Sequence, residues 1–169
     1  MRFAYADPPY WGLAAQFYGD PYYDKLEAHR DLLRHLDTYD AWAYSLHVPA
    51  LPTLVQYLPP GARIGAWVKP FASFKPGVDP AYTWEPVFFR SARKWDPTKL
   101  TVRDYHAATI AMERGFPGAK PDSFCYWIFE LVGAQPDDEF VDLFPGSGAV
   151  TRAWDAWRGQ HRLALGTPA

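Results

Sequence analysis

The sequence contains a single cysteine, Cys125, among 169 residues. A lone cysteine excludes an intrachain disulfide and any zinc site built on several thiolates. The five histidines are scattered without the spacing of metal ligands, so we expect no bound metal. The sequence also lacks a secretory signal pattern and any apolar run long enough to cross a bilayer. We therefore expect a cytoplasmic protein without membrane contact.

The sequence also lacks a large excess of either acidic or basic residues. The 17 Lys and Arg residues against 19 Asp and Glu give a net charge of -2, which excludes the strongly basic footprint of a bulk nucleic-acid binder. Two segments nevertheless interleave basic with aromatic residues. They contain Lys69, Phe71, Phe74 and Lys75, and then Arg90, Arg93, Lys94, Trp95, Lys99 and Arg103. Such segments suit phosphate contact with base stacking, and they also suit a solvated surface loop.

The sequence is rich in hydrophobic residues, at 49%, and in aromatic residues, at 18%. A chain of this length and composition can bury one core, so we expect one domain over residues 1–169. Its 17 prolines interrupt regular structure often, which predicts short elements joined by many loops.

Short apolar segments alternate with amphipathic segments along the chain. We expect strands at 2–6, 41–47, 63–68, 84–89, 140–144 and 161–165, and helices at 24–37, 49–58, 105–114, 121–132 and 149–157. Loops are expected at 11–23, 70–82 and 91–106, and Pro86 predicts an edge position for its strand. The alternation indicates an α/β fold, a mostly parallel sheet with helices on both faces. Ligands of such sheets bind beyond the carboxyl ends of the strands.

A glycine turn, Asp142-Leu143-Phe144-Pro145-Gly146-Ser147-Gly148, joins an expected strand to an expected helix. Glycines let the backbone approach a ligand, and a helix N-terminus offers free N–H groups to an anionic ligand end. Two glycines without a following lysine argue against a dinucleotide fingerprint and against a phosphate-binding loop. The pattern alone fits a ligand-binding turn and an ordinary strand-to-helix turn.

A second loop, Asp7-Pro8-Pro9-Tyr10, directly follows the first expected strand. The carboxylate of Asp7 and the carbonyl of Pro8 are hydrogen-bond acceptors, and Pro8 has no N–H that could compete locally. Two acceptors aimed at one amino group would hold both of its hydrogens and turn its lone pair toward an electrophile. Tyr10 adds an aromatic face on which a base can stack. An ordinary proline turn is the alternative reading.

In this order, the two motifs resemble those of the S-adenosylmethionine-dependent amino-methyltransferases that act on nucleic-acid bases. In that family the catalytic loop reads Asp/Asn/Ser-Pro-Pro-Tyr/Phe/Trp and the cofactor loop reads Asp-x-Phe-x-Gly-Ser-Gly. A catalytic loop that precedes the cofactor loop is similar to the circularly permuted beta class, which includes many bacterial and phage DNA methyltransferases. Eukaryotic RNA adenine-N6 methyltransferases share this order. The Lys120-Pro121 pair and the strand ending Trp67-Val68-Lys69 are also family-like.

The resemblance implies a Rossmann-like methyltransferase fold with permuted motif order and S-adenosylmethionine as cofactor. Asp at the first catalytic position is associated in this family with adenine N6, so DNA adenine is the expected target. The implied catalytic residues are Asp7, Pro8, Pro9 and Tyr10. The implied cofactor residues are Lys120, Pro121, Asp142, Phe144, Pro145, Gly146 and Gly148. From their positions in the chain, we expect substrate contacts from Trp11, Lys69, Arg93 and Lys94, and His47 beside the site.

Other functions stay open at this point. They are a non-catalytic partner or scaffold with a methyltransferase fold, a cytosine-N4 or RNA adenine enzyme, and a methyltransferase for a small molecule or a protein amide. The segment 162–167 offers no acidic residue for the cofactor ribose, which favours the non-catalytic reading, whereas the intact Asp-Pro-Pro-Tyr loop argues against it. A homo- or hetero-oligomer could supply target selectivity.

Overall fold

The computed structural model describes residues 1–71, 77–94, 97–98, 100–113 and 116–164. A six-stranded sheet with the order β5-β3-β4-β2-β1-β8 forms its centre. The strands of this sheet are β1 (Arg2–Ala6), β2 (Ala41–Ser45), β3 (Arg63–Val68), β4 (Trp84–Arg90), β5 (Tyr105–Ala107) and β8 (Glu139–Asp142). Two further strands, β6 (Ala111–Glu113) and β7 (Phe116–Ala119), pair antiparallel with each other.

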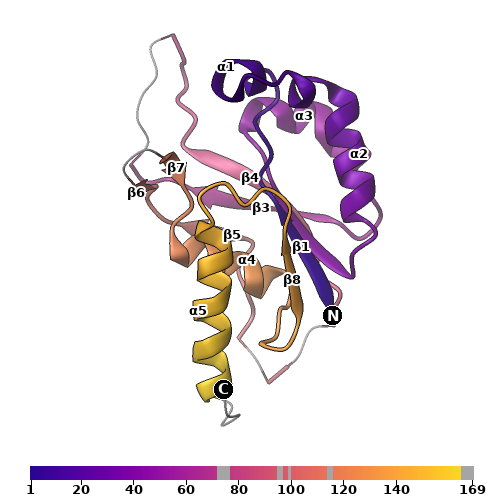
Figure 1. Cartoon of the computed structure of the whole chain (residues 1–169), viewed down its shortest axis with the longest axis vertical. Coiled ribbons are helices and arrows are strands. Elements are labelled where there is room, and N and C mark those ends of the chain that lie inside the picture. Colours follow the sequence, from indigo (N-terminus) through magenta and orange to yellow (C-terminus); the bar gives the residue numbers. More distant parts are fainter. Residues whose placement is uncertain (72–76, 95–96, 99, 114–115, 165–169) are drawn as a thin grey trace.

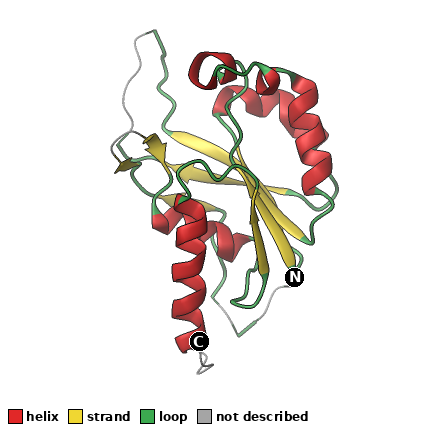
Figure 2. Ribbon diagram, viewed as in Figure 1, coloured by secondary structure: helices red, strands yellow, loops and turns green. Residues whose placement is uncertain are grey.

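Helices cover both faces of the sheet (Figures 1 and 2). The helical segments are α1 (Ala14–Tyr18), η1 (Tyr22–Asp24), α2 (Leu26–Leu36), η2 (Val48–Ala50), α3 (Leu51–Leu54), η3 (Val55–Tyr57), α4 (Asp122–Leu131) and α5 (Ala149–Ala164). One buried cluster packs α4 and α5 against the sheet, and a second cluster packs α2 and α3 against the opposite face. Five strands run parallel and only β4 runs against them. The predicted α/β architecture is therefore confirmed.

Each face of the sheet is covered where the sequence places apolar residues at helical spacing. In α2 the buried residues Ala28, Leu32, Leu33 and Leu36 lie on one stripe, while the charged residues face solvent. Helix α4 buries nearly its whole length, including Phe124, Ile128 and Phe129. The strands β1 and β2, covered on both faces, are apolar almost throughout.

The predicted edge position of Pro86 is wrong, because β4 lies between β3 and β2. The last pair of the β2–β4 ladder joins Ser45 to Val87, so Pro86 stands just beyond the end of β2. Its carbonyl still accepts a hydrogen bond from Leu46 N, at 3.2 Å. In an antiparallel strand the N–H and C=O of a residue point to the same side, so the missing N–H faces away from β3 and the ladder between β3 and β4 loses no hydrogen bond.

The helix predicted at 105–114 is also wrong, because this stretch forms β5 and then β6. The backbone of β5 satisfies the free edge of β3. Ala66 N donates to Asp104 O at 2.9 Å, and Ala108 N donates to Val68 O at 3.0 Å. These long-range pairs outweigh the weak local pattern from which the helix was predicted.

The strand predicted at 161–165 is replaced by the last turn of α5, which reaches Ala164, and residue 165 lies outside the described residues. His161 stacks on Trp157 with ring centroids 3.9 Å apart, a pair that only helical i, i+4 spacing brings together. Arg162 pairs with Asp137 at 2.5 Å and ties this turn to the loop before β8.

Smaller differences concern the boundaries of elements. The expected loop at 11–23 contains α1 and η1, and the helix expected at 49–58 is divided into η2, α3 and η3. The strand expected at 140–144 ends at Asp142, so Leu143 and Phe144 belong to the turn. No helix of the described ranges is both long and apolar enough to span a membrane.

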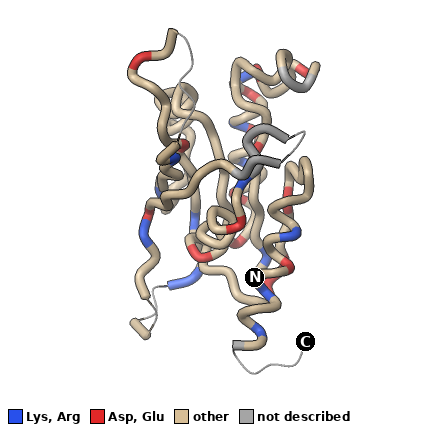
Figure 3. The backbone as a smooth tube through the Cα atoms, turned by 90° about the vertical axis from the view of Figure 1, so that its left-hand side faces the viewer, with Lys and Arg blue, Asp and Glu red and all other residues tan. Residues whose placement is uncertain are grey.

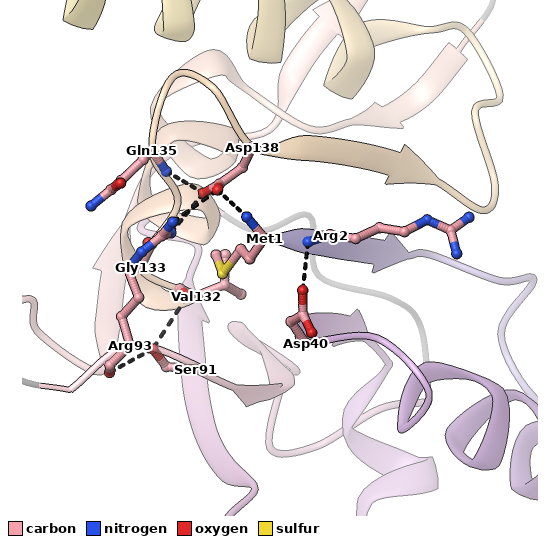
Figure 4. A network of polar contacts seen from close by, with 9 residues as sticks. All are labelled: Met1, Arg2, Asp40, Ser91, Arg93, Val132, Gly133, Gln135 and Asp138. Carbon is pink, nitrogen blue, oxygen red and sulfur yellow. Dashed lines mark hydrogen bonds and ion pairs between the residues drawn. The ribbon is translucent and has the colours of Figure 1, made fainter.

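A polar network at the amino end of β1 joins three distant parts of the chain (Figure 4). The carboxylate of Asp138 accepts from the Met1 ammonium at 2.6 Å and from both terminal nitrogens of Arg93 at 2.6 and 2.8 Å. Gln135 N donates to the same carboxylate at 2.7 Å. The guanidinium of Arg93 also reaches the carbonyl of Gly133, at 2.5 Å. This network closes the sheet at the end opposite to Asp7.

Candidate active site

The carboxyl edge of the sheet gathers the segments that the sequence singled out. Asp7 follows β1, Lys69 follows β3, and the glycine turn follows β8. Because β4 runs antiparallel, its beginning lies at the same edge, where Trp67 pairs with Glu85. Lys120 precedes α4 and points its ammonium to within 3.3 Å of Asp7 Oδ1.

Asp7 combines a buried oxygen with an accessible side. Its Oδ1 is buried 3.3 Å from the Lys120 ammonium, whereas 28% of the side chain remains exposed. Burial raises the pKa of Asp7, the nearby Lys120 ammonium opposes this shift, and Glu85 adds to it. The exposed part of this carboxylate is open to a donor that arrives from outside the protein.

The loop behind Asp7 is fixed by a second carboxylate, that of Asp24. Ala14 N and Ala15 N donate to it at 2.8 and 2.9 Å, and Trp11 Nε1 donates to the Asp24 carbonyl at 2.9 Å. The bonds from Ala15 and Ala14 lower the pKa of the Asp24 carboxyl, which therefore stays ionised. The bond from Trp11 Nε1 holds Trp11 in a fixed position beside the proline loop.

Four charged side chains meet next to the loop. Lys120 Nζ lies 3.3 Å from Asp7 Oδ1 and 3.4 Å from Glu85 Oε2, and Lys69 donates to Glu85 Oε1. The side chain of Lys120 is only 5% exposed and packs over the rings of Trp67 and Phe124. Burial lowers the pKa of Lys120, but the carboxylates of Asp7 and Glu85 together raise it by more than burial lowers it. The net shift of this pKa is upward, so the ammonium stays charged.

An aromatic hollow adjoins this cluster. Tyr10 and His47 stack with centroids 5.1 Å apart and an angle of 6° between the rings. Trp11, Tyr44 and His29 line the same hollow, together with Pro8, Pro9, Ser45, Leu46 and Ala50. The side chains fill this hollow, and its flat rings are surfaces on which a planar aromatic ligand could stack after Tyr10 moves away from His47.

Beneath the hollow, His29 makes a hydrogen bond with each ring nitrogen. Nδ1 lies 2.6 Å from the Tyr44 hydroxyl, and Nε2 lies 2.7 Å from the Tyr23 carbonyl. A carbonyl only accepts, so Nε2 carries the proton and Nδ1 accepts from Tyr44. Burial lowers the pKa of His29, which agrees with a neutral ring.

The turn after β8 is held by Asp142. Its carboxylate accepts from Phe144 N and from Thr151 Oγ1, both at 3.2 Å. Gly146 and Gly148 have φ angles of 49° and 76°, a region that glycine occupies without strain. Burial raises the pKa of Asp142, and its two donors oppose the shift. The turn leads directly into α5, a helix of 16 residues.

The structure thus brings together most of the residues singled out from the sequence. The proline loop, Trp11, Lys69 and Lys120 form one cluster, and the Asp142 turn follows the neighbouring strand β8. Arg93 instead pairs with Asp138 at the opposite end of β1, and Lys94 is exposed next to it. Phe74, Lys75, Trp95 and Lys99 lie outside the described residues.

Sequence reasoning missed Glu85, His29 and Tyr44. The signal for Glu85 was present, because a carboxylate at the second position of an otherwise apolar strand needs a partner. His29 and Tyr44 gave no such signal, since their contact depends on how α2 packs on β2. Among the described residues, no group of three or more His, Cys, Asp or Glu could hold a metal ion.

Fold and site together define a Rossmann-like α/β protein with a candidate ligand site at the carboxyl edge of its parallel strands. No protein-family model matches the chain, and no curated protein matches it. Among solved structures it is similar to M1.HpyAVI in complex with SAM, with a TM-score of 0.60 and 15% identity over 93% of this chain and 78% of that one. A second structure of M1.HpyAVI gives 0.59 and 14%, over 94% and 76%. This likeness confirms the predicted fold.

Proposed function

We propose that this protein is an S-adenosylmethionine-dependent methyltransferase that methylates an exocyclic amino group of a nucleobase, adenine N6 in DNA. The observation that carries the proposal is the carboxylate of Asp7, which pairs with the Lys120 ammonium through its buried Oδ1 while 28% of the side chain is exposed, at the carboxyl end of a central strand. The order of the two motifs and the shared fold with a protein solved in complex with SAM support it.

The glycine turn fits one end of the cofactor. Positive φ at Gly146 and Gly148 keeps side chains away from the strand end, and Asp142 is held there by two donors. Phe144 offers an apolar contact, and Pro145 accepts from Gly148 N and closes the turn. The cofactor supplies the methyl group, whose bond to sulfur breaks as its bond to nitrogen forms.

The proline loop acts on the substrate amino group. The amino nitrogen of a base is a weak nucleophile because its lone pair is delocalised into the ring. Asp7 and the Pro8 carbonyl accept its two hydrogens, and Tyr10 and Trp11 hold the base in the aromatic hollow. The proton displaced by methylation leaves through the exposed side of Asp7 or into solvent.

The nucleic-acid partner has to be held without a strongly basic surface. Figure 3 shows basic and acidic residues interspersed along the chain. Lys94 is exposed, whereas Lys69, which lies beside the proline loop, is engaged with Glu85. We therefore expect weak, salt-sensitive binding of DNA, with a flipped or single-stranded adenine as the reacting base.

Asp7→Ala tests the proposal. Without the acceptor, we expect the turnover number to fall about 100-fold or more. The affinity for S-adenosylmethionine, measured by calorimetry, should change little, since the Asp142 turn is intact. Asp31→Ala, an exposed carboxylate on α2, is the matched control. Full turnover by a folded Asp7→Ala variant would overturn the assignment of Asp7.

A further inference from the structure

Glu85 is the carboxylate that the proposed reaction does not yet use. It stands at the second position of β4, only 12% of its side chain is exposed, and it lies beside the proline loop. Lys69 donates to its Oε1, Lys120 Nζ lies 3.4 Å from its Oε2, and the Tyr10 hydroxyl donates to the same carboxylate. Glu85 therefore contacts Lys120 and Tyr10, which lie at the candidate site, and Lys69, which holds Glu85 itself in place.

The Lys120 ammonium is divided between two carboxylates. Its distances to Asp7 and Glu85 are nearly equal, 3.3 and 3.4 Å, and neither is a short, fully formed bond. Two acids and two lysines balance in charge, so the cluster can stay ionised although it is mostly buried. Since Lys120 is shared with Glu85, Asp7 Oδ1 keeps a nearby positive charge at 3.3 Å but no short bond to it.

We propose that Glu85 is a positioning residue for methyl transfer: it holds Lys120 and Tyr10 so that the carboxylate of Asp7 stays free to accept from the substrate amino group. The inference rests on the proposed function. Lys69 has the supporting role, because it holds the second oxygen of Glu85. Without Glu85, the ammonium of Lys120 would have Asp7 as its nearest carboxylate and would compete with the substrate for it.

Glu85 and Lys69 have opposite effects on the carboxylate of Asp7. Glu85 raises the pKa of Asp7 and Lys69 lowers it. The titratable groups that face this carboxylate are Tyr5, Tyr44, Lys69, Glu85, Lys120, Cys125 and Asp142. The pKa values of Tyr5, Tyr44 and Cys125 are raised by burial, so these three stay neutral near neutral pH.

The test compares Glu85→Gln and Lys69→Met with the wild-type protein in methyl transfer to DNA across pH. For Glu85→Gln we expect kcat to fall about tenfold or more, the dissociation constant for S-adenosylmethionine to stay within about twofold, and the acid limb of kcat/KM to move to lower pH. For Lys69→Met the acid limb should move to higher pH. Glu85→Asp, which keeps the charge, should restore the wild-type limb.

Glu139→Gln, an exposed carboxylate on β8, is the matched control and should leave all three quantities unchanged. An unchanged kcat and acid limb in a folded Glu85→Gln protein would overturn the inference. If that variant does not fold, an acid limb of Lys69→Met that stays at the wild-type pH or moves to lower pH would overturn it instead. A wild-type protein that methylates no polymer would refute the proposed function. A wild-type protein that is active, together with a Glu85→Gln variant that is equally active, would refute only the role of Glu85.

Discussion

His29 supports the floor of the aromatic hollow through two buried hydrogen bonds. Replacing it with Phe leaves the Tyr44 hydroxyl and the Tyr23 carbonyl without their partner. Each unsatisfied buried group costs about 1–3 kcal/mol, so we expect His29→Phe to lower the free energy of unfolding by about 3 kcal/mol. Denaturant titration measures this change. His35→Phe, on the exposed side of the same helix, should cost far less.

The same side chain makes stability depend on pH. The pKa of His29 is lowered in the folded protein, so the unfolded chain binds a proton first as the pH falls. The contribution of His29 to stability should therefore be complete at pH values above the ordinary histidine pKa, and it should decline as the pH falls below that value. The decline should be smaller in His29→Phe than in wild type. Equal declines in both proteins would show that His29 does not stay neutral.

At the residue scale, the sequence predicted the groups that follow strand ends but not their partners. Asp7, Lys69 and Asp142 could be placed at one edge because each terminates a parallel strand. Glu85 could not, because its place depends on the register of β4 against β3. Arg93 appeared in a basic segment, yet its partner Asp138 is distant in the sequence and only the fold joins them.

The turn before α5 is the element that we propose as the cofactor-binding turn. Gly148 has a φ of 76°, and a Cβ there would meet Arg152 Nη1 at 3.2 Å. Gly148→Ala should therefore cost about 1–2 kcal/mol of unfolding free energy and weaken S-adenosylmethionine binding. Gly159→Ala, within α5 and with open space around it, should stabilise the protein by about 0.5–1 kcal/mol.

Calorimetric titration and thermal unfolding of these two variants check both effects. Unchanged cofactor affinity in Gly148→Ala would show that the turn does not contact the cofactor. Stabilisation by both substitutions would contradict the strain argued for Gly148.

At the element scale, prediction succeeded where local chemistry decides. Proline ended the strands at Ala6 and Val68 where expected, and apolar spacing located α2 and α4. It failed at 105–107, where a distant contact decides, because these residues pair with the free edge of β3. It failed at 161–165 for a local reason, since the stacking of His161 on Trp157 at i, i+4 spacing continues α5.

For the molecule as a whole, the Arg93–Asp138 network ties the amino end of β1 to the loop before β8 (Figure 4). Arg93→Met removes a two-pronged bond from a buried carboxylate and should lower the free energy of unfolding by about 2 kcal/mol. Arg2→Met, which breaks an exposed pair, should cost at most about 0.5 kcal/mol. Chemical denaturation of the two variants measures the difference.

The same substitution decides between two roles for Arg93. If its guanidinium serves the fold, DNA affinity at a fixed salt concentration should stay close to wild type in Arg93→Met. A loss of DNA affinity with unchanged stability would instead support the substrate contact expected from the sequence.

The most direct test of the account as a whole is methyl incorporation from isotope-labelled S-adenosylmethionine into DNA and RNA, read by mass spectrometry of the nucleosides. The account predicts labelled N6-methyldeoxyadenosine in the DNA. Label on cytosine N4 or on RNA adenosine would keep the chemistry at Asp7 and correct the target. No label on any nucleoside, from a folded protein, would contradict the account and favour a non-catalytic partner with the same fold.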